Sequence, residues 1–206
     1  SNNIHVVLLD MQDLWFQKIQ KSKVGRLKKL EIPSNFLLYP ASTWEHKNHK
    51  SLLMAINNLK KKDLHLVCTG HLTDYYFNEL FPLISELNLN SQVQFLGIVS
   101  DEELYELYHS CHAVVIPTLY EAGSFPLMES ILMQIPVICS NVTSLPETIG
   151  DLKFVFDPKS IDDLSSKIKS IWDDEEFRNE NLITTKKQAK KLIHNSSAMK
   201  IHSIYD

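Results

Sequence analysis

Short apolar runs alternate with helical patterns along most of this chain. Six runs follow residue 35, and each is almost continuously apolar: FLLYPA (36–41), LHLVCT (64–69), VQFLG (93–97), AVVIPT (113–118), PVICS (136–140) and KFVFD (153–157). Continuous runs of this length are typical of strands that are covered on both faces. The segments between them have the apolar spacing of amphipathic helices. The pattern therefore predicts an α/β fold, a Rossmann-like, doubly wound sheet of six parallel strands.

The predicted sheet also predicts where a ligand would bind. A common strand order for such a fold is 3-2-1-4-5-6, and ligands bind at the carboxyl ends of the strands where this order reverses. The two loops at that point are residues 42–49, STWEHKNH, and residues 119–126, LYEAGSFP. They are the most chemically unusual stretches of the chain, so we expect a site there.

Composition excludes several classes of protein. The chain is 44% hydrophobic and 22% charged, which is ordinary for a globular domain, and no apolar run reaches the ~20 residues of a membrane span. A net charge of −4 gives no support to nucleic acid binding. The basic runs at 23–29 and 186–191 are interpreted as solvated helix faces, with docking to an anionic membrane as the alternative.

The three cysteines and the ends of the chain are less informative. Cys68, Cys111 and Cys139 lack metal-type spacing and are predicted to be reduced thiols of a cytoplasmic protein. Residues 4–10, IHVVLLD, look like one strand that precedes a polar connector. Residues 160–182 are predicted to hold a helix and then an acidic turn, and residues 184–206 one or two amphipathic helices. Ser-x-x-acid capping boxes are predicted at residues 100–103, 144–147 and 160–163.

Two glutamates flank the strand-to-helix turn at residues 121–129. Pro126 is placed like a first-turn residue, and Gly123 permits an unusual backbone conformation before it. Glu121 then lies in the loop and Glu129 in the first helical turn. The backbone N–H groups of residues 123–127 would face the same crevice and favour an anion. A phosphate and hydroxyl groups would suit this arrangement. The alternative, about equally supported, is that Glu129 complements the helix dipole and Glu121 is a solvated charge.

The loop at 42–49 offers a cation. Lys47 can neutralise a phosphate as a point charge, and Asn48 or Ser51 could cap the following helix. His46 and His49 lack an evident third ligand, so no metal site is predicted. The chain has no Asp-x-Asp, G-x-G-x-x-G or P-loop motif. Gly70, after the second apolar run, is expected to form a tight turn near the ligand, or simply a turn.

These residues resemble a known family. EAGSFPLME (121–129) is similar to the E-x7-E motif of family 4 retaining glycosyltransferases, which have the GT-B fold. Similarity extends to residues 93–121, to PVICSNVTSLPETIGD (136–151), to HKN in the first phosphate loop, and to residues 156–178. It runs from about residue 36 to the end. Each motif alone would be weak, but together they are specific.

The resemblance implies a role for each site residue. Glu129 would bind the ribose hydroxyls of a nucleotide sugar and Lys47 its diphosphate, while Val99 would lie near the base. Glu121 would hold the donor sugar and phosphate together with the amides around Gly123, Ser124 and Phe125. Gly70 would also lie at the donor. Ser42 occupies the position where family members often have an arginine, so one positive charge is missing or comes from elsewhere.

The resemblance predicts the donor-binding domain of a retaining, metal-independent hexosyltransferase. It would use a UDP- or GDP-sugar as co-substrate, with Glu121 and Lys47 as catalytic residues and no cofactor. The alternatives are a GT-B nucleotide-sugar epimerase and a non-catalytic nucleotide-binding module. Its partners would be a saccharide or lipid-linked acceptor and an N-terminal domain of the same polypeptide. We expect a cytoplasmic protein that can contact the inner face of the membrane.

The resemblance also implies a domain division. Residues 1–35 would be part of the N-terminal domain and the interdomain linker. Residues 36–182 would form the Rossmann-like nucleotide-sugar domain, and residues 183–206 would be C-terminal helices that pack back on the N-terminal domain. On this interpretation the chain alone binds a nucleotide but transfers no sugar.

Overall fold

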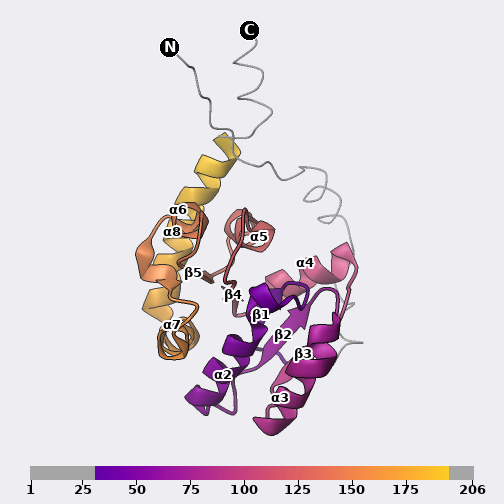
Figure 1. The fold of residues 1–206 in the computed structure, drawn as a ribbon. Coiled ribbons are helices and arrows are strands. Elements are labelled where there is room, and N and C mark those ends of the chain that lie inside the picture. Colours follow the sequence, from indigo (N-terminus) through magenta and orange to yellow (C-terminus); the bar gives the residue numbers. More distant parts are fainter. Residues whose placement is uncertain (1–30, 195–206) are drawn as a thin grey trace.

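A computed structural model describes residues 31–194 of the chain. Its centre is a parallel sheet of six strands in the order β3-β2-β1-β4-β5-β6, which confirms both the predicted fold class and the predicted strand order (Figure 1). The strands are β1 (Leu37–Pro40), β2 (Leu66–Thr69), β3 (Val93–Phe95), β4 (Ala113–Ile116), β5 (Val137–Ser140) and β6 (Val155–Phe156). Each strand lies inside one of the predicted apolar runs.

The helices cover both faces of the sheet. On one face α2 (His49–Leu59) packs against α7 (Ile161–Asp173), with α3 (Phe81–Glu86) beside them (Figure 1). On the other lie α4 (Asp101–Ser110), α5 (Phe125–Leu132) and α6 (Leu145–Ile149), and α8 (Glu175–His194) packs on α5 and α6. Short helical turns are η2 (Glu45–Lys47), η3 (Tyr76–Leu80) and η4 (Leu152–Phe154). Among these elements, no helix has the length and apolar character needed to cross a membrane.

The central strands are buried on both faces, which is why their sequence does not alternate. Leu37 and Leu38 of β1 are completely buried, and so are the neighbouring Val114 and Val115 of β4. Successive side chains of a strand point to opposite faces. Both faces therefore exclude water, and burial of such side chains contributes roughly 1.5–3 kcal/mol each.

Of the three predicted capping boxes, one is complete. At α4, the Glu103 amide donates to Ser100 Oγ (3.2 Å) and the Ser100 amide donates to the Glu103 carboxylate (2.8 Å). Ser160 caps α7, but the Asp163 carboxylate accepts from the Asp157 amide instead of closing the box. The prediction of a capping box at Ser144 is wrong, because its side chain makes no capping hydrogen bond. Its backbone is already helical (φ −89°, ψ −2°), whereas a capping side chain requires an extended residue.

The C-terminal helix begins earlier than predicted. A single residue, Asp174, separates α7 from α8, and its side chain accepts a hydrogen bond from the Phe177 amide (3.0 Å). The acidic turn is thus the N-cap of one continuous helix from Glu175, and the predicted start at residue 184 is wrong. The proposed division between residues 182 and 183 falls within this helix. Thr185 and Ala189 of α8 are buried against the domain.

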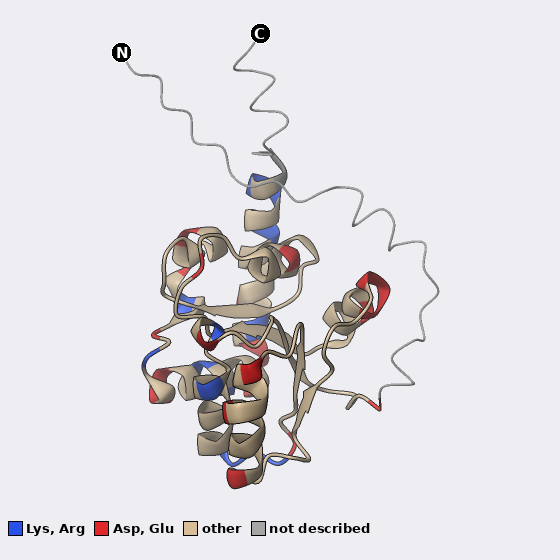
Figure 2. Cartoon of the chain, turned by 45° about the vertical axis from the view of Figure 1, so that its right-hand side comes forward, with Lys and Arg blue, Asp and Glu red and all other residues tan. Residues whose placement is uncertain are grey.

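Charges are distributed at the ends of the helices. Acidic residues occupy the first turn of α4, and lysines line the C-terminal half of α8 (Figure 2). The four lysines at positions 186, 187, 190 and 191 are exposed while Gln188 and Ala189 between them are buried, so the second basic run is a solvated helix face. The predicted strand at residues 4–10, the basic run at 23–29 and residues 195–206 lie outside the described residues.

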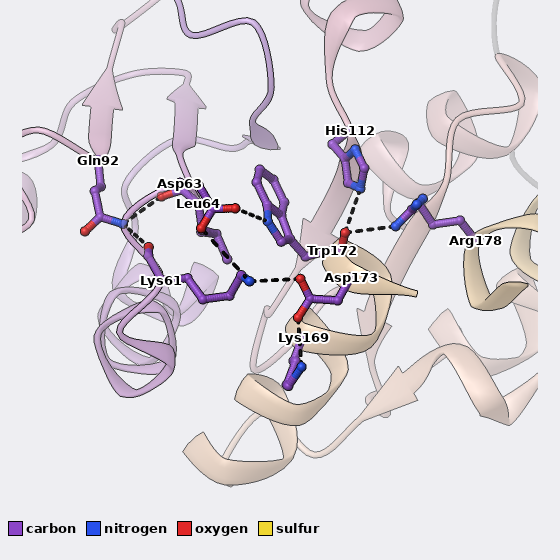
Figure 3. Close-up of polar contacts among 9 residues, drawn as sticks. All are labelled: Lys61, Asp63, Leu64, Gln92, His112, Lys169, Trp172, Asp173 and Arg178. Carbon is purple, nitrogen blue, oxygen red and sulfur yellow. Dashed lines mark hydrogen bonds and ion pairs between the residues drawn. The ribbon is translucent and has the colours of Figure 1, made fainter. Parts of the chain in front are cut away.

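A polar network fixes α7 and α8 to the amino ends of the strands (Figure 3). The Trp172 indole donates to Asp63 (3.3 Å), and Lys61 lies 2.9 Å from the Asp173 carboxylate. The Arg178 guanidinium donates to the Trp172 carbonyl (2.9 Å). These charges are used in packing at the end of the sheet opposite the predicted site.

Candidate functional site

A cleft of about 290 Å³ lies at the carboxyl ends of the central strands. It is bounded by the loop after β1, the end of β2, the segment after β3 and the first turn of α5. Five residues predicted for the site line it together, although they come from four separate parts of the sequence: Ser42, Gly70, Val99, Phe125 and Glu129. The strand order brings them together, because β1 and β4 are neighbours and the carboxyl ends of parallel strands share one edge.

Gly70 is required by a close approach of two loops. Its φ is +117°, and a Cβ atom built there would lie 2.6 Å from the Ser42 amide nitrogen. Only glycine combines this backbone conformation with that contact. The Gly70 amide also donates to the Gly97 carbonyl (2.8 Å), and the His71 amide donates to Ser42 Oγ (3.2 Å). Three loops are thereby held at fixed positions around the cleft, which favours the expectation of a turn at the ligand.

Glu129 is the acidic group of the cleft. It lies one turn into α5, and its Oε2 accepts a hydrogen bond of 2.5 Å from the hydroxyl of Tyr108 on α4. Burial raises the pKa of the Glu129 carboxyl above its ordinary value of 4.5, Tyr108 opposes this shift, and Asp101 adds to it. Glu129 is therefore a partly buried, hydrogen-bonded carboxylate and not a solvated charge at the helix end.

Lys47 and Glu121 form an ion pair beside the cleft. Lys47 Nζ lies 2.6 Å from Glu121 Oε2, and their side chains are only 18% and 15% exposed. The two loops that carry them are joined as well, since the Leu119 amide donates to the His46 carbonyl (2.8 Å). Glu121 is therefore not a solvated loop charge. The two glutamates of the 121–129 segment have different environments: Glu129 lines the cleft, and Glu121 binds Lys47.

The first turn of α5 presents backbone amides. Ser124 is the N-cap, and its buried hydroxyl accepts a hydrogen bond from the Leu127 amide (3.4 Å). The Leu127 amide was expected to be free for a ligand, and this expectation is wrong. Pro126 has no N–H. Within residues 31–194 the amides of Gly123, Ser124 and Phe125 have no partner. They remain available to an anion at the positive end of the helix.

Asn48 has a structural function that the sequence did not reveal. It occupies the N-cap position of α2 with φ +61°, but its side chain does not cap the helix. Instead its buried amide donates to the carbonyls of Pro117 (2.9 Å) and Pro158 (3.0 Å). These bonds tie the Lys47 loop to the ends of β4 and β6 and hold the lysine beside the cleft.

His49, the first residue of α2, is not a ligand candidate. It is 1% exposed, its ring packs against Tyr39 and Phe95, and burial lowers its pKa to about 3. The Ala41 carbonyl opposes that shift. His49 is therefore a neutral core residue, and His46, in the exposed loop, does not share a buried site with it.

Comparison with known proteins identifies the family. The family model described as glycosyl transferases group 1 matches residues 26–192. The chain belongs to this family. It is 31% identical over 156 residues to the O-antigen chain mannosyltransferase B of Escherichia coli, covering 74% of this chain and 41% of that protein. It is 32% identical over 174 residues to the MMP alpha-(1->4)-mannosyltransferase of Mycolicibacterium hassiacum, covering 82% of this chain and 40% of that protein. The chain thus spans about two fifths of the length of these relatives.

Solved structures of glycosyltransferases share the fold. The Anabaena protein HepE, solved in complex with UDP and glucose, superposes with a TM-score of 0.75 at 17% identity, covering 87% of this chain and 50% of that chain. At this identity the likeness establishes the fold alone. Together with the family match, it confirms that the sheet is of the type found in GT-B glycosyltransferases.

Proposed function

We propose that this chain is the donor-binding part of a retaining, metal-independent glycosyltransferase. The polypeptide that contains it would move a hexose from a UDP- or GDP-sugar to a saccharide acceptor. The observation that carries the proposal is the cleft and its surroundings: a partly buried carboxylate lines the cleft, and a helix N-terminus with free amides and a lysine lie beside it, where a parallel sheet binds nucleotides. The names of the two relatives favour mannosyl as the transferred group.

Each group has a chemical role in this proposal. Glu129 accepts hydrogen bonds from the ribose hydroxyls, and Val99 with its apolar neighbours faces the base. Lys47 and the amides at Gly123 and Phe125 stabilise the diphosphate as it leaves, in an electrostatic role that needs no metal ion. Glu121, released from Lys47, accepts from a hydroxyl of the donor sugar.

The acceptor is proposed to bind elsewhere in the polypeptide. The cleft opens at the edge of one sheet, so the reactive carbon of a bound sugar would face away from the described residues. Holding an acceptor in contact with that carbon can supply roughly 7–11 kcal/mol of barrier lowering. A second domain, preceding this one and linked through residues 1–35, is proposed to do so. The part of residues 183–206 that follows the buried stretch of α8 is proposed to contact it.

Titration calorimetry with UDP, GDP and ADP tests the proposal. We expect one of the three to bind the 206-residue chain more tightly than the others. Binding of the matching nucleoside monophosphate should be weaker, because it presents less charge to Lys47 and the amides. Absence of binding by all three nucleotides would contradict the proposed function.

A further inference from the structure

We propose that Tyr108 is a positioning residue for nucleotide recognition. Its hydroxyl holds Oε2 of Glu129, so that the remaining oxygen, Oε1, is presented to the ribose hydroxyls of a nucleotide in the cleft. The inference rests on the proposed function and adds a residue to the site. Tyr108 lies beside Leu107 among the buried residues of α4, and the proposed function gives its hydroxyl no role.

The geometry of the pair carries the inference. Tyr108 is completely buried in the last turn of α4, and its hydroxyl lies 2.5 Å from Glu129 Oε2. A hydrogen bond this short is typical of a charged acceptor. The complete capping box at Ser100 fixes the other end of α4, and the Cys111 amide continues the helical bonding at its last turn. The donor therefore belongs to a well-fixed element, while the acceptor lines the cleft.

A purely structural role would not require this partner. A buried tyrosine hydroxyl needs an acceptor, and a backbone carbonyl suffices; Tyr39, also fully buried, donates to the Lys47 carbonyl (2.8 Å). Tyr108 donates instead to an ionisable group, whose burial is costly unless it has hydrogen-bond partners. Such an arrangement is expected where the carboxylate has to be both ionised and fixed in orientation.

The charges around Glu129 agree with this role. Burial raises the pKa of the Glu129 carboxyl, and Asp101 of α4 raises it further, whereas the Tyr108 hydroxyl opposes both. Burial and the Glu129 carboxylate also raise the pKa of the Tyr108 phenol, so the phenol stays protonated and remains the donor. Lys47, the cation proposed for the site, forms its ion pair with Glu121. Tyr108 thus favours the ionised form of Glu129 and fixes one of its oxygens.

The test compares ribose with 2′-deoxyribose in a single pair of variants. Tyr108→Phe removes only the hydroxyl, and Tyr105→Phe removes a hydroxyl from the same helix and serves as the matched control. Each variant is titrated with the nucleoside diphosphate that the wild type binds among UDP, GDP and ADP, and with its 2′-deoxy form. Thermal melting confirms that each variant is folded.

The expected result is a loss of ribose preference in one variant alone. Tyr108→Phe should bind the ribonucleotide about three- to tenfold more weakly, with little change for the 2′-deoxy form, because the Glu129 side chain is no longer fixed beforehand and has to be ordered when the nucleotide binds. As pH is lowered, the variant should lose affinity for the ribonucleotide at a higher pH than the wild type does, because Glu129 becomes easier to protonate. Tyr105→Phe should behave as the wild type does.

Three outcomes would overturn the inference, and they are distinguishable. If the wild type binds none of the nucleotides, the proposed function fails and the inference fails with it. If the wild type prefers ribose and Tyr108→Phe keeps both affinity and preference, the proposed function stands and only the inference fails. Should Tyr108→Phe not fold, a crystal structure of the wild type with bound nucleotide decides: the Tyr108 bond to Oε2 should persist while Oε1 contacts ribose, and a Glu129 turned away from Tyr108 would contradict the inference.

Discussion

Lys47 Nζ lies 2.6 Å from Glu121 Oε2, and this pair joins the two loops that flank the cleft. In the proposed function, Lys47 binds the diphosphate and Glu121 the donor sugar, so the donor has to replace the contact that each makes with the other. Both groups are largely shielded from water. Binding therefore exchanges one ion pair for another and does not require a free lysine to be desolvated.

Replacing Glu121 with glutamine tests this exchange. The variant should bind a bare nucleoside diphosphate about 1.4- to fivefold more tightly, because a partly exposed ion pair is worth roughly 0.2–1 kcal/mol and no longer competes. It should lose affinity for the complete nucleotide sugar relative to the diphosphate. Calorimetry with both ligands measures the two effects, and a variant that binds both more weakly would show that Glu121 does not compete for Lys47.

Lys47→Ala should weaken binding of the diphosphate much more than binding of the bare nucleoside. The lysine supplies the positive charge of a loop in which Ser42 stands where family members often have an arginine. The difference in loss between diphosphate and nucleoside should shrink as salt is raised, because partly exposed charges are screened. Affinities for nucleoside and diphosphate at two salt concentrations provide the measurement. Equal losses for the two ligands would refute the assignment of Lys47 to phosphate.

Glu129→Ala should weaken binding of the nucleoside diphosphate by about tenfold or more, since a hydrogen bond to a charged group contributes roughly 1.5–3 kcal/mol. Ser124, the N-cap of the same helix, is left intact, so α5 should keep its structure. The dissociation constant and the far-ultraviolet circular dichroism spectrum are measured together. Unchanged affinity in the folded variant would leave Glu129 without a part in nucleotide binding.

Glu129→Gln should stabilise the unliganded protein, and more so at higher pH. Because the folded pKa of Glu129 is raised above 4.5, the contribution of this carboxyl to wild-type stability is fully present below that value and is lost as pH rises through the folded pKa. The variant has no such loss. We expect the variant to melt at a higher temperature than the wild type at pH 7. The difference should nearly vanish at pH 4, and a difference that grows at low pH would contradict the raised pKa.

The fold was predictable from sequence because it depends on periodicity. The continuous apolar runs that hold Leu38 and Val115 indicate strands buried on both faces, and connected helices restrict the sheet to a few strand orders. Helix ends were less predictable. The serine at 144 has a capping pattern but a helical backbone, and Asp174 caps α8 from within a run of acids. Local patterns suggest a cap, but the path of the neighbouring chain decides whether it forms.

The site was predictable only in part. Loop positions followed from the strand order, so the approach of Ser42, Gly70 and Glu129 to one cleft could be expected. Partners brought by tertiary packing could not. Tyr108 has the same apolar spacing whether or not its hydroxyl meets Glu129, and the buried bonds of Asn48 depend on where β4 and β6 end. A polar atom within an apolar stripe is the only signal that the sequence offered.

The most direct measurement is an NMR map of the bound nucleotide. Amide shifts of the isotopically labelled chain are recorded while UDP, GDP or ADP, whichever binds, is added. We predict that the largest changes occur at Gly70, Val99 and Phe125, around the cleft at the carboxyl ends of the strands. A second cavity of about 200 Å³, lined by Ile56, Lys60 and Leu89, lies at the opposite end of the sheet. Changes centred there, with the amides of the first cleft unaffected, would contradict the donor-binding assignment.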